Sequence, residues 1–137
     1  MSHITAAQFA DRFVALILAG RELPKKHLDR HIVLISSILK IEPGRRYSEK
    51  EINEQLQIWI IHFGRSFALD HVTLRRYLVD EKYLSRDPTG GTYELAAKGW
   101  PYTFDESIRE LDLVKRVAEA KQARELKKQQ YLKQSSK

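Results

Sequence analysis

Residues 70–95 read DHVTLRRYLVDEKYLSRDPTGGTYEL, and this stretch decides the fold. Asp70 can cap a helix, because its side chain accepts hydrogen bonds from the unpaired amides of a first turn. A helix over residues 71–81 places Leu74 and Leu78 on one apolar face. We therefore predict a helix that is anchored by leucines and whose other face is open.

The second half of the same stretch predicts a β-hairpin. Residues 83–86 and 92–95 alternate between apolar and polar side chains, as strands with one buried face do. Residues 87–91, Asp-Pro-Thr-Gly-Gly, are rich in turn-forming types. A third short strand is expected at residues 45–47, which would widen the hairpin into a small sheet.

A second helix is predicted immediately upstream of this stretch. Ser48 and Glu51 have the spacing of a capping box, in which each side chain accepts a hydrogen bond from the other residue's backbone amide. The helix is expected over residues 49–60, followed by a connector over residues 62–69. Its inward side chains are expected to be Ile52, Leu56 and Trp59.

A third helix is predicted over residues 28–40. Residues 42–44, Glu-Pro-Gly, end it, because proline disfavours a helical residue before it and glycine permits a tight reversal. The apolar stripe expected to face the core consists of Leu28, Ile32, Ile35 and Leu39.

One helix is predicted at each end of the chain. Thr5 and Gln8 form a capping box for the first, and Gly20 ends it. The last helix is expected from about Asp105, and its inward side chains are expected to be Ile108, Leu111, Val114 and Ala118. The first helix is apolar over more than one face, so it either inserts into the core or pairs with a second copy. We expect a homodimer through these terminal helices.

The order of the elements predicts a mainly α fold with a small β-hairpin, of the α+β class. Three helices followed by a two-stranded hairpin, with a flanking helix at each end, is the order of a winged helix-turn-helix. The expected parts are an N-terminal flanking helix over 1–22, a winged-helix domain over 23–98, a C-terminal flanking helix over 99–118 and a basic, poorly packed tail over 119–137.

Several motifs in the chain resemble one protein family. Residues 46–53, RYSEKEIN, look like its N-terminal signature, and residues 70–80, DHVTLRRYLVD, look like its core. Residues 84–86, LSR, and 91–93, GTY, extend the core. The family is the uncharacterised bacterial group catalogued as domain of unknown function 2087, and the resemblance covers roughly residues 23–95. Its members are similar to winged-helix transcription regulators, so the resemblance implies a winged-helix fold and a bacterial source.

The charge of the chain is concentrated at its C-terminal end. The formal net charge is +6, and residues 115–137 hold eight basic and two acidic residues, so residues 1–114 carry sixteen of each sign. The tail is either an arm that contacts nucleic-acid phosphates or a solvated end. Zero cysteines exclude disulfides and thiolate metal sites, and no apolar run is long enough to span a bilayer. We expect a cytoplasmic protein without a membrane anchor.

The leucine-anchored helix carries the candidate DNA-contacting residues. Arg76 and Thr73 lie opposite the leucines, and Arg75 lies at the edge of that face. A guanidinium group can hold a guanine edge or a phosphate in two hydrogen bonds. The residues expected to hold flanking phosphates are Arg45, Arg46, Lys50 and Arg86. The alternative is that Arg75 or Arg76 pairs inside the molecule with Asp70, Asp80 or Glu81.

The remaining motifs favour structure over chemistry. The hairpin tip holds an acid and no cation, so the hairpin is expected to be structural. His27 and His31 stand four apart without a third ligand, and we expect two partly exposed histidines rather than a metal site. Ser66, His62 and His71 lack the context of a nucleophile. The aromatic residues around Trp100 are expected to fill the seam before the last helix. We predict no enzyme activity and no cofactor.

The sequence therefore predicts a winged-helix protein that binds double-stranded DNA and regulates bacterial transcription. A module for protein–protein interaction, or adaptor, without sequence-specific DNA binding is the alternative. Neither the DNA sequence nor an effector follows from the residues.

Overall fold

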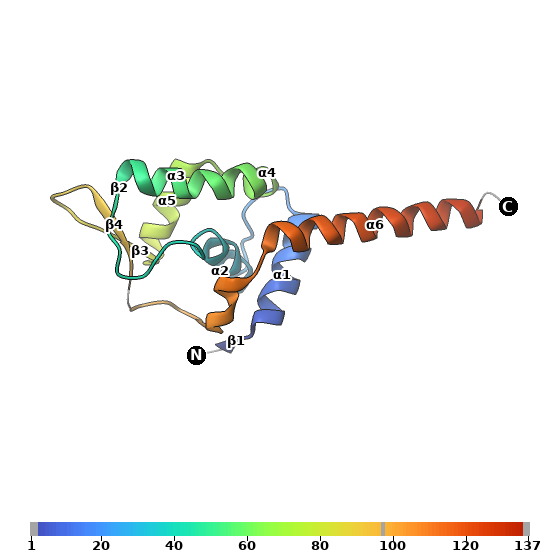
Figure 1. Ribbon diagram of the computed structural model, residues 1–137, viewed down its shortest axis with the longest axis horizontal. Helices are drawn as coiled ribbons and strands as arrows, with labels where there is room; N and C mark the ends of the chain where they lie inside the picture. Colours follow the sequence, from blue (N-terminus) through green and yellow to red (C-terminus); the bar gives the residue numbers. More distant parts are fainter. Residues whose placement is uncertain (1–2, 97, 136–137) are drawn as a thin grey trace.

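The computed structural model describes residues 3–96 and 98–135. Its mostly helical architecture with a small antiparallel sheet confirms the α+β class (Figure 1). The helices are α1 (Ala6–Ala19), α2 (His27–Ser36), α3 (Glu49–Trp59), α4 (Arg65–Phe67), α5 (His71–Asp80) and α6 (Leu113–Ser135), with a π-helix η1 (Ile60–Gly64) and a 3-10 helix η2 (Glu106–Glu110). The strands are β1 (His3–Ile4), β2 (Tyr47–Ser48), β3 (Leu84–Arg86), β4 (Thr92–Leu95) and β5 (Thr103–Phe104).

The predicted hairpin is the centre of a three-stranded sheet. Strands β3 and β4 pair antiparallel, and β2 pairs with the other edge of β4, which gives the order β2-β4-β3. Tyr93 in β4 lies between Tyr47 and Arg86 in this register. The expected third strand is therefore present, at residues 47–48 instead of the predicted 45–47. The order α2, β2, α3, α5, hairpin is the order that the winged-helix interpretation predicts.

The three predicted helix caps are confirmed. The Thr5–Gln8 and Ser48–Glu51 pairs both form complete capping boxes. Asp70 caps α5 by accepting a hydrogen bond of 2.7 Å from the amide of Thr73. These caps satisfy amides that have no partner inside their helix, which explains why the helices begin where the polar residues stand.

The connector predicted over residues 62–69 is wrong, because the helix continues. After α3 the chain widens into η1 and then closes as α4, up to Ala68, whose φ is +52°. The continuation buries Phe63 against Phe13, with ring centroids 5.0 Å apart, and Phe67 beside the Trp59 ring. Packing of these aromatic rings overrides the helix-breaking tendency of Gly64.

Helix α2 is shorter and more deeply buried than predicted. It ends at Ser36, and the next residues form tighter turns, such as the bond from the Ser37 amide to the Leu34 carbonyl. Ile32 and Ile35 are buried as expected, and so are the intervening Val33 and Leu34. The inward position predicted for Leu28 is wrong, since this residue is 37% exposed. Because α2 is surrounded by other elements, it needs no polar face. Its buried residues are therefore not confined to one apolar stripe that the sequence could reveal.

The single C-terminal helix predicted from Asp105 is two helices. The 3-10 helix η2 ends before Leu111, and Asp112 starts α6 by accepting a hydrogen bond of 3.0 Å from the Lys115 amide. The break shifts the helical phase, so that Leu113 and Val117 are buried with Ile108. The inward positions predicted for Val114 and Ala118 are therefore wrong, and Leu111 is only half-buried.

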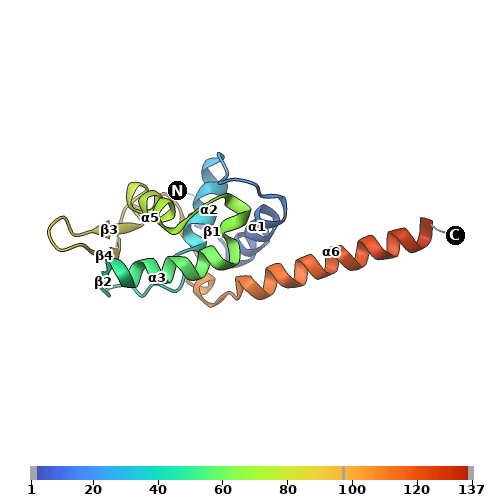
Figure 2. The ribbon, with the colours of Figure 1, turned by 90° about the horizontal axis from the view of Figure 1, so that it is seen from above.

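The flanking helices share one hydrophobic core with the central elements. Phe9 and Phe13 of α1 are fully buried in the cluster that contains Ile32 of α2 and Leu74 of α5. Arg12 joins α1 to α2 through two bonds of 2.7 Å to the Asp29 carboxylate. Helix α6 leaves the body after its first turns (Figure 2). No helix within the described ranges is both long enough and apolar enough to cross a membrane.

Candidate nucleic-acid interface

Helix α5 lies between α3 and the hairpin, with its leucines inward. Leu74 and Leu78 are fully buried, whereas Val72, Arg76 and Asp80 are exposed. The orientation predicted from the sequence is therefore confirmed. The Asp70 cap at its start fixes this end, and the amide of Thr73 that bonds to it lowers the pKa of the Asp70 carboxyl.

Arg75 is paired within the molecule, which is the alternative to its being free to contact DNA. Its guanidinium donates a hydrogen bond of 2.5 Å to Asn53 Oδ1 and lies 3.2 Å from the Glu49 carboxylate. The side chain is only 17% exposed, and its guanidinium carbon lies 5.5 Å from the centre of the Tyr93 ring. Arg75 therefore ties α5 to α3 and to the sheet.

The partners of Arg75 differ from those considered in the sequence. Glu49 and Asn53 stand four residues apart, so both project from the same face of α3. This spacing is the one feature of the sequence that links Glu49 with Asn53. It predicts that they share a face of α3, but it does not predict that Arg75 lies against that face. For Tyr93 the sequence predicts a place in a strand, but it does not predict the contact with Arg75.

Arg76 is the exposed arginine of the pair. Within the described residues it makes no hydrogen bond and no ion pair. It lies with Arg86 on a shallow hollow of about 290 Å³ between α5 and the hairpin, and Tyr93 and Asp80 line the same hollow. The structure therefore brings together three of the predicted residues at this hollow, Arg75 and Arg76 from α5 and Arg86 from β3.

A second hollow lies next to the first one, along the hairpin. It has a volume of about 320 Å³ and is lined by Arg46 and Arg86. Arg46 is 77% exposed and lies 3.8 Å from the Glu94 carboxylate, a loose pair. Arg86 lies above the Tyr93 ring at 5.9 Å. We call Arg46, Arg76 and Arg86 the arginine strip.

The other predicted residues, Arg45, Lys50 and Thr73, line neither hollow and differ in how far they are paired. Arg45 pairs with Glu51 at 3.2 Å and stacks on the Tyr47 ring at 4.6 Å, so it is partly committed. Lys50 is exposed and forms no ion pair with any described residue. Thr73 is half-buried in the first turn of α5.

The hairpin tip is built around its own acid. Asp87 Oδ1 accepts hydrogen bonds of 2.9 Å from both the amide and the hydroxyl of Thr89. The bond from the amide contributes most to lowering the pKa of the Asp87 carboxyl. The carboxylate is occupied in holding the turn, in keeping with a structural hairpin.

His31 differs from the expectation of partial exposure, whereas His27 is exposed. His31 is buried, its Nδ1 shares a hydrogen bond with the Tyr83 hydroxyl, and its Nε2 lies 3.6 Å from Glu81. Burial lowers the pKa of His31 and raises the pKa of Tyr83. His27 bonds to the Tyr102 hydroxyl at 2.6 Å. No group of three or more potential metal ligands occurs in the described part of the chain.

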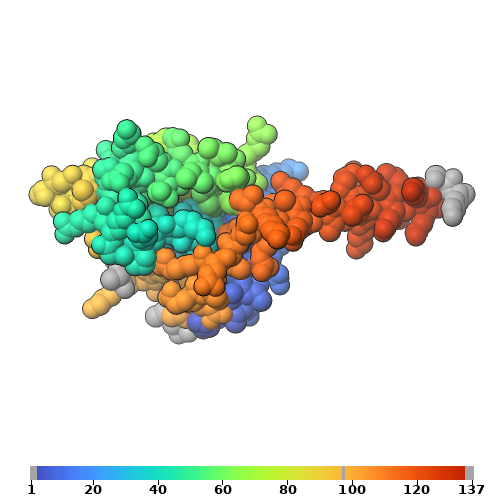
Figure 3. Space-filling model, viewed as in Figure 1, coloured from blue at the N-terminus to red at the C-terminus, as the bar shows by residue number. Residues whose placement is uncertain are grey.

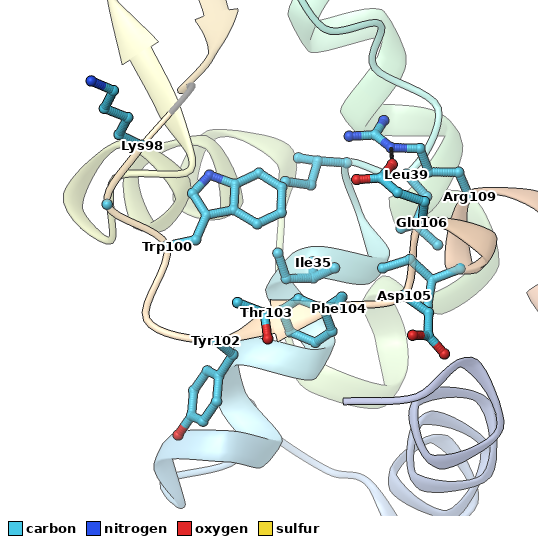
Figure 4. A pocket seen from close by; sticks show the side chains of 13 residues that line it. Ile35, Leu39, Lys98, Trp100, Tyr102, Thr103, Phe104, Asp105, Glu106 and Arg109 are labelled. Carbon is cyan, nitrogen blue, oxygen red and sulfur yellow. Dashed lines mark ion pairs between the residues drawn. The ribbon is translucent and has the colours of Figure 1, made fainter. Parts of the chain in front are cut away.

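A cavity of about 360 Å³ lies where the connector after the hairpin crosses α2 (Figure 4). Its wall is apolar, with Ile35 and Phe104 beside the Trp100 ring. The indole donates a hydrogen bond of 3.1 Å to the Ala96 carbonyl and packs edge-on against Tyr83. Trp100 thus fills the seam, as predicted. Cations and acids alternate at the rim, so no ligand class is indicated.

The family assignment agrees with the sequence motifs. Residues 21–95 match the family model described as "Uncharacterized protein conserved in bacteria (DUF2087)". The chain belongs to this bacterial family, because the match covers more than half of its length. Neither a curated protein nor a solved structure matches the chain. The matched residues include α5, the hairpin and the whole arginine strip.

Proposed function

We propose that this protein binds double-stranded DNA as a winged-helix protein and acts as a transcriptional regulator. Helix α5 is the element that enters the major groove, and the hairpin lies beside it as a structural wing. The proposal is supported by the order of the elements and by the open, leucine-anchored orientation of α5.

The observation that carries the proposal is the arginine strip. Arg76 from α5, Arg86 from β3 and Arg46 before β2 line two hollows that share Arg86 and Tyr93. Guanidinium groups on adjoining elements match phosphates along one strand, and their binding releases counterions. Arg75 serves as a positioning residue that holds α5 against α3.

The test is a titration of a fluorescently labelled, mixed-sequence duplex with the full chain at low salt. Binding is measured by fluorescence anisotropy. Arg76→Ala and Arg86→Ala should each weaken binding about fivefold to tenfold, the effect of one lost phosphate contact. Arg65→Ala is the matched control, because Arg65 is exposed on α4, far from the hairpin (Figure 1). Equal weakening of binding by all three variants would reduce DNA binding to a general effect of charge, and affinities equal to that of the wild type would overturn the proposal.

An adaptor that binds another protein is the second candidate. It is favoured by the acids around the strip, since Asp80 and Glu94 line the same hollows and repel phosphates. The exposed Val72 on α5 adds apolar surface to this face. An adaptor would show no arginine-dependent affinity for duplex, so the same titration separates the two functions.

A further inference from the structure

The outer part of α6 has little tertiary support, and its contacts lie near the end of α1. Leu113 and Val117 anchor its first turns, but residues 118–134 are exposed apart from the half-buried Ala120. Figure 3 shows this segment extending from the body as a separate rod. A lone helix of this length is marginal in water, because its stability comes mainly from packing one face. The exposed surface of this segment is therefore a candidate docking surface.

One face of α6 carries a regular stripe. The spacing of four and three residues places its members on one side of the helix. The stripe consists of Val114, Ala118, Lys121, Glu125, Lys128 and Leu132. Its ends are apolar and exposed, with Val114 at 43% and Leu132 at 55%, and its centre is charged.

Two concave surfaces beside the stripe could accommodate another helix. Near its centre, Lys121 and Glu125 line a shallow hollow of about 560 Å³ with Ile17 and Leu18 at the end of α1. At its start, Val114 lines a groove of about 460 Å³ that also contains the exposed Ile58. A helix laid along the stripe would cover apolar surface at both places.

We infer that a second copy of this chain covers the stripe, with the two α6 helices antiparallel about a two-fold axis that crosses the stripe between Lys121 and Glu125. In this register Val114 meets the partner's Leu132, and Lys121 meets the partner's Glu125. Two-fold symmetry repeats both contacts, so the interface has two apolar ends and two ion pairs at its centre. Ala118 faces the partner's Lys128, where a small side chain leaves room for a long one.

The stripe fits a copy of itself better than a nucleic acid. A phosphate backbone would meet Glu125 at the centre and apolar side chains at the ends, whereas the antiparallel copy places a cation opposite each Glu125. Lys121 and Glu125 form no ion pair with each other in the described structure, so both are available. The hairpin and the outer end of α6 lie at opposite ends of the molecule (Figure 1), and pairing therefore leaves the arginine strip exposed.

The decisive experiment exchanges the two central charges and measures dimer dissociation by sedimentation of the full chain. Lys121→Glu and Glu125→Lys should each weaken the homodimer about tenfold, because two exposed pairs change from attraction to repulsion. A one-to-one mixture of the two variants should dimerise as tightly as the wild type, since every charge then faces its opposite. A change within one helix could not produce this rescue.

A second pair of variants tests which face is covered. Val114→Asp should weaken the dimer at least tenfold, because it places a charge at both apolar ends. Leu126→Asp is the matched control, since Leu126 is 54% exposed and lies off the stripe, about a third of a turn around α6, and it should leave the dissociation constant unchanged.

Three results would overturn the inference. These are a wild-type chain that stays monomeric at all concentrations, a mixture that dimerises no better than its components, and a loss of dimer in Leu126→Asp alone. If the chain is monomeric and Lys121→Glu weakens duplex binding, α6 is a nucleic-acid arm. Because the readout is sedimentation without DNA, a failure of the proposed function leaves the result unaffected.

Discussion

Replacing Arg75 with alanine should destabilise the fold, whereas replacing its neighbour Arg76 should not. The hydrogen bond from Arg75 to the partly buried Asn53 contributes about 1 kcal/mol. The ion pair adds less than about 1 kcal/mol, since the Glu49 side chain is 56% exposed. Packing of the guanidinium on the Tyr93 ring adds about 0.5 kcal/mol. We therefore expect Arg75→Ala to lower the free energy of unfolding by about 2 kcal/mol.

Urea unfolding at neutral pH measures this loss directly. Arg76→Ala is the control, because it removes the same side chain from the next position and should cost less than about 0.5 kcal/mol. A double-mutant cycle of Arg75→Ala with Asn53→Ala should give a coupling energy of about 1 kcal/mol. Equal unfolding free energies for the two arginine variants, or a coupling energy near zero, would refute the division between a positioning and an exposed arginine.

Three other properties follow from the same structure. Ser48→Ala removes a capping box and should lower the free energy of unfolding by about 1 kcal/mol, while Ser85→Ala on an exposed strand position should leave it unchanged. Gly64→Ala should cost about 1–3 kcal/mol in the same assay, because its Cβ would lie 2.9 Å from an Ile60 methyl carbon, and a loss below 0.5 kcal/mol would contradict the close packing. Burial lowers the pKa of His31, so the unfolded chain binds more protons and stability should fall as the pH drops below 6.5. His31→Gln should flatten that fall between pH 7.5 and 5.5, and unchanged acid sensitivity would contradict the assignment.

Local signals in the sequence predicted the elements well. The Ser48 capping box and the Asp70 cap specify helix starts through contacts only three residues apart. The spacing of the leucines predicted which face of α5 is buried, because side chains three and four residues apart lie on the same face of a helix. The alternating residues of β4 did the same for that strand, whereas β3 buries Leu84 and exposes both Ser85 and Arg86.

Contacts between distant residues could not be predicted in the same way. The parallel pairing of β1 with β5 joins residues about a hundred positions apart, and nothing in either dipeptide indicates the other. The shift of the inward face from Val114 to Leu113 arose from the break at Asp112, which changes the helical phase. The contacts of Arg75 with Glu49 and Asn53 depend on how α3 packs against α5. They could therefore not be predicted before the positions of both helices were known.

The salt dependence of duplex binding tests the central claim most directly. The slope of the logarithm of affinity against the logarithm of salt concentration counts the neutralised phosphates, at about 0.9 for each. If the arginine strip grips the backbone, the combined variant Arg46→Ala/Arg76→Ala/Arg86→Ala should lose between two and three units of slope relative to Arg65→Ala, by the same estimate. Identical slopes for the two variants would contradict the account and leave the adaptor as the function.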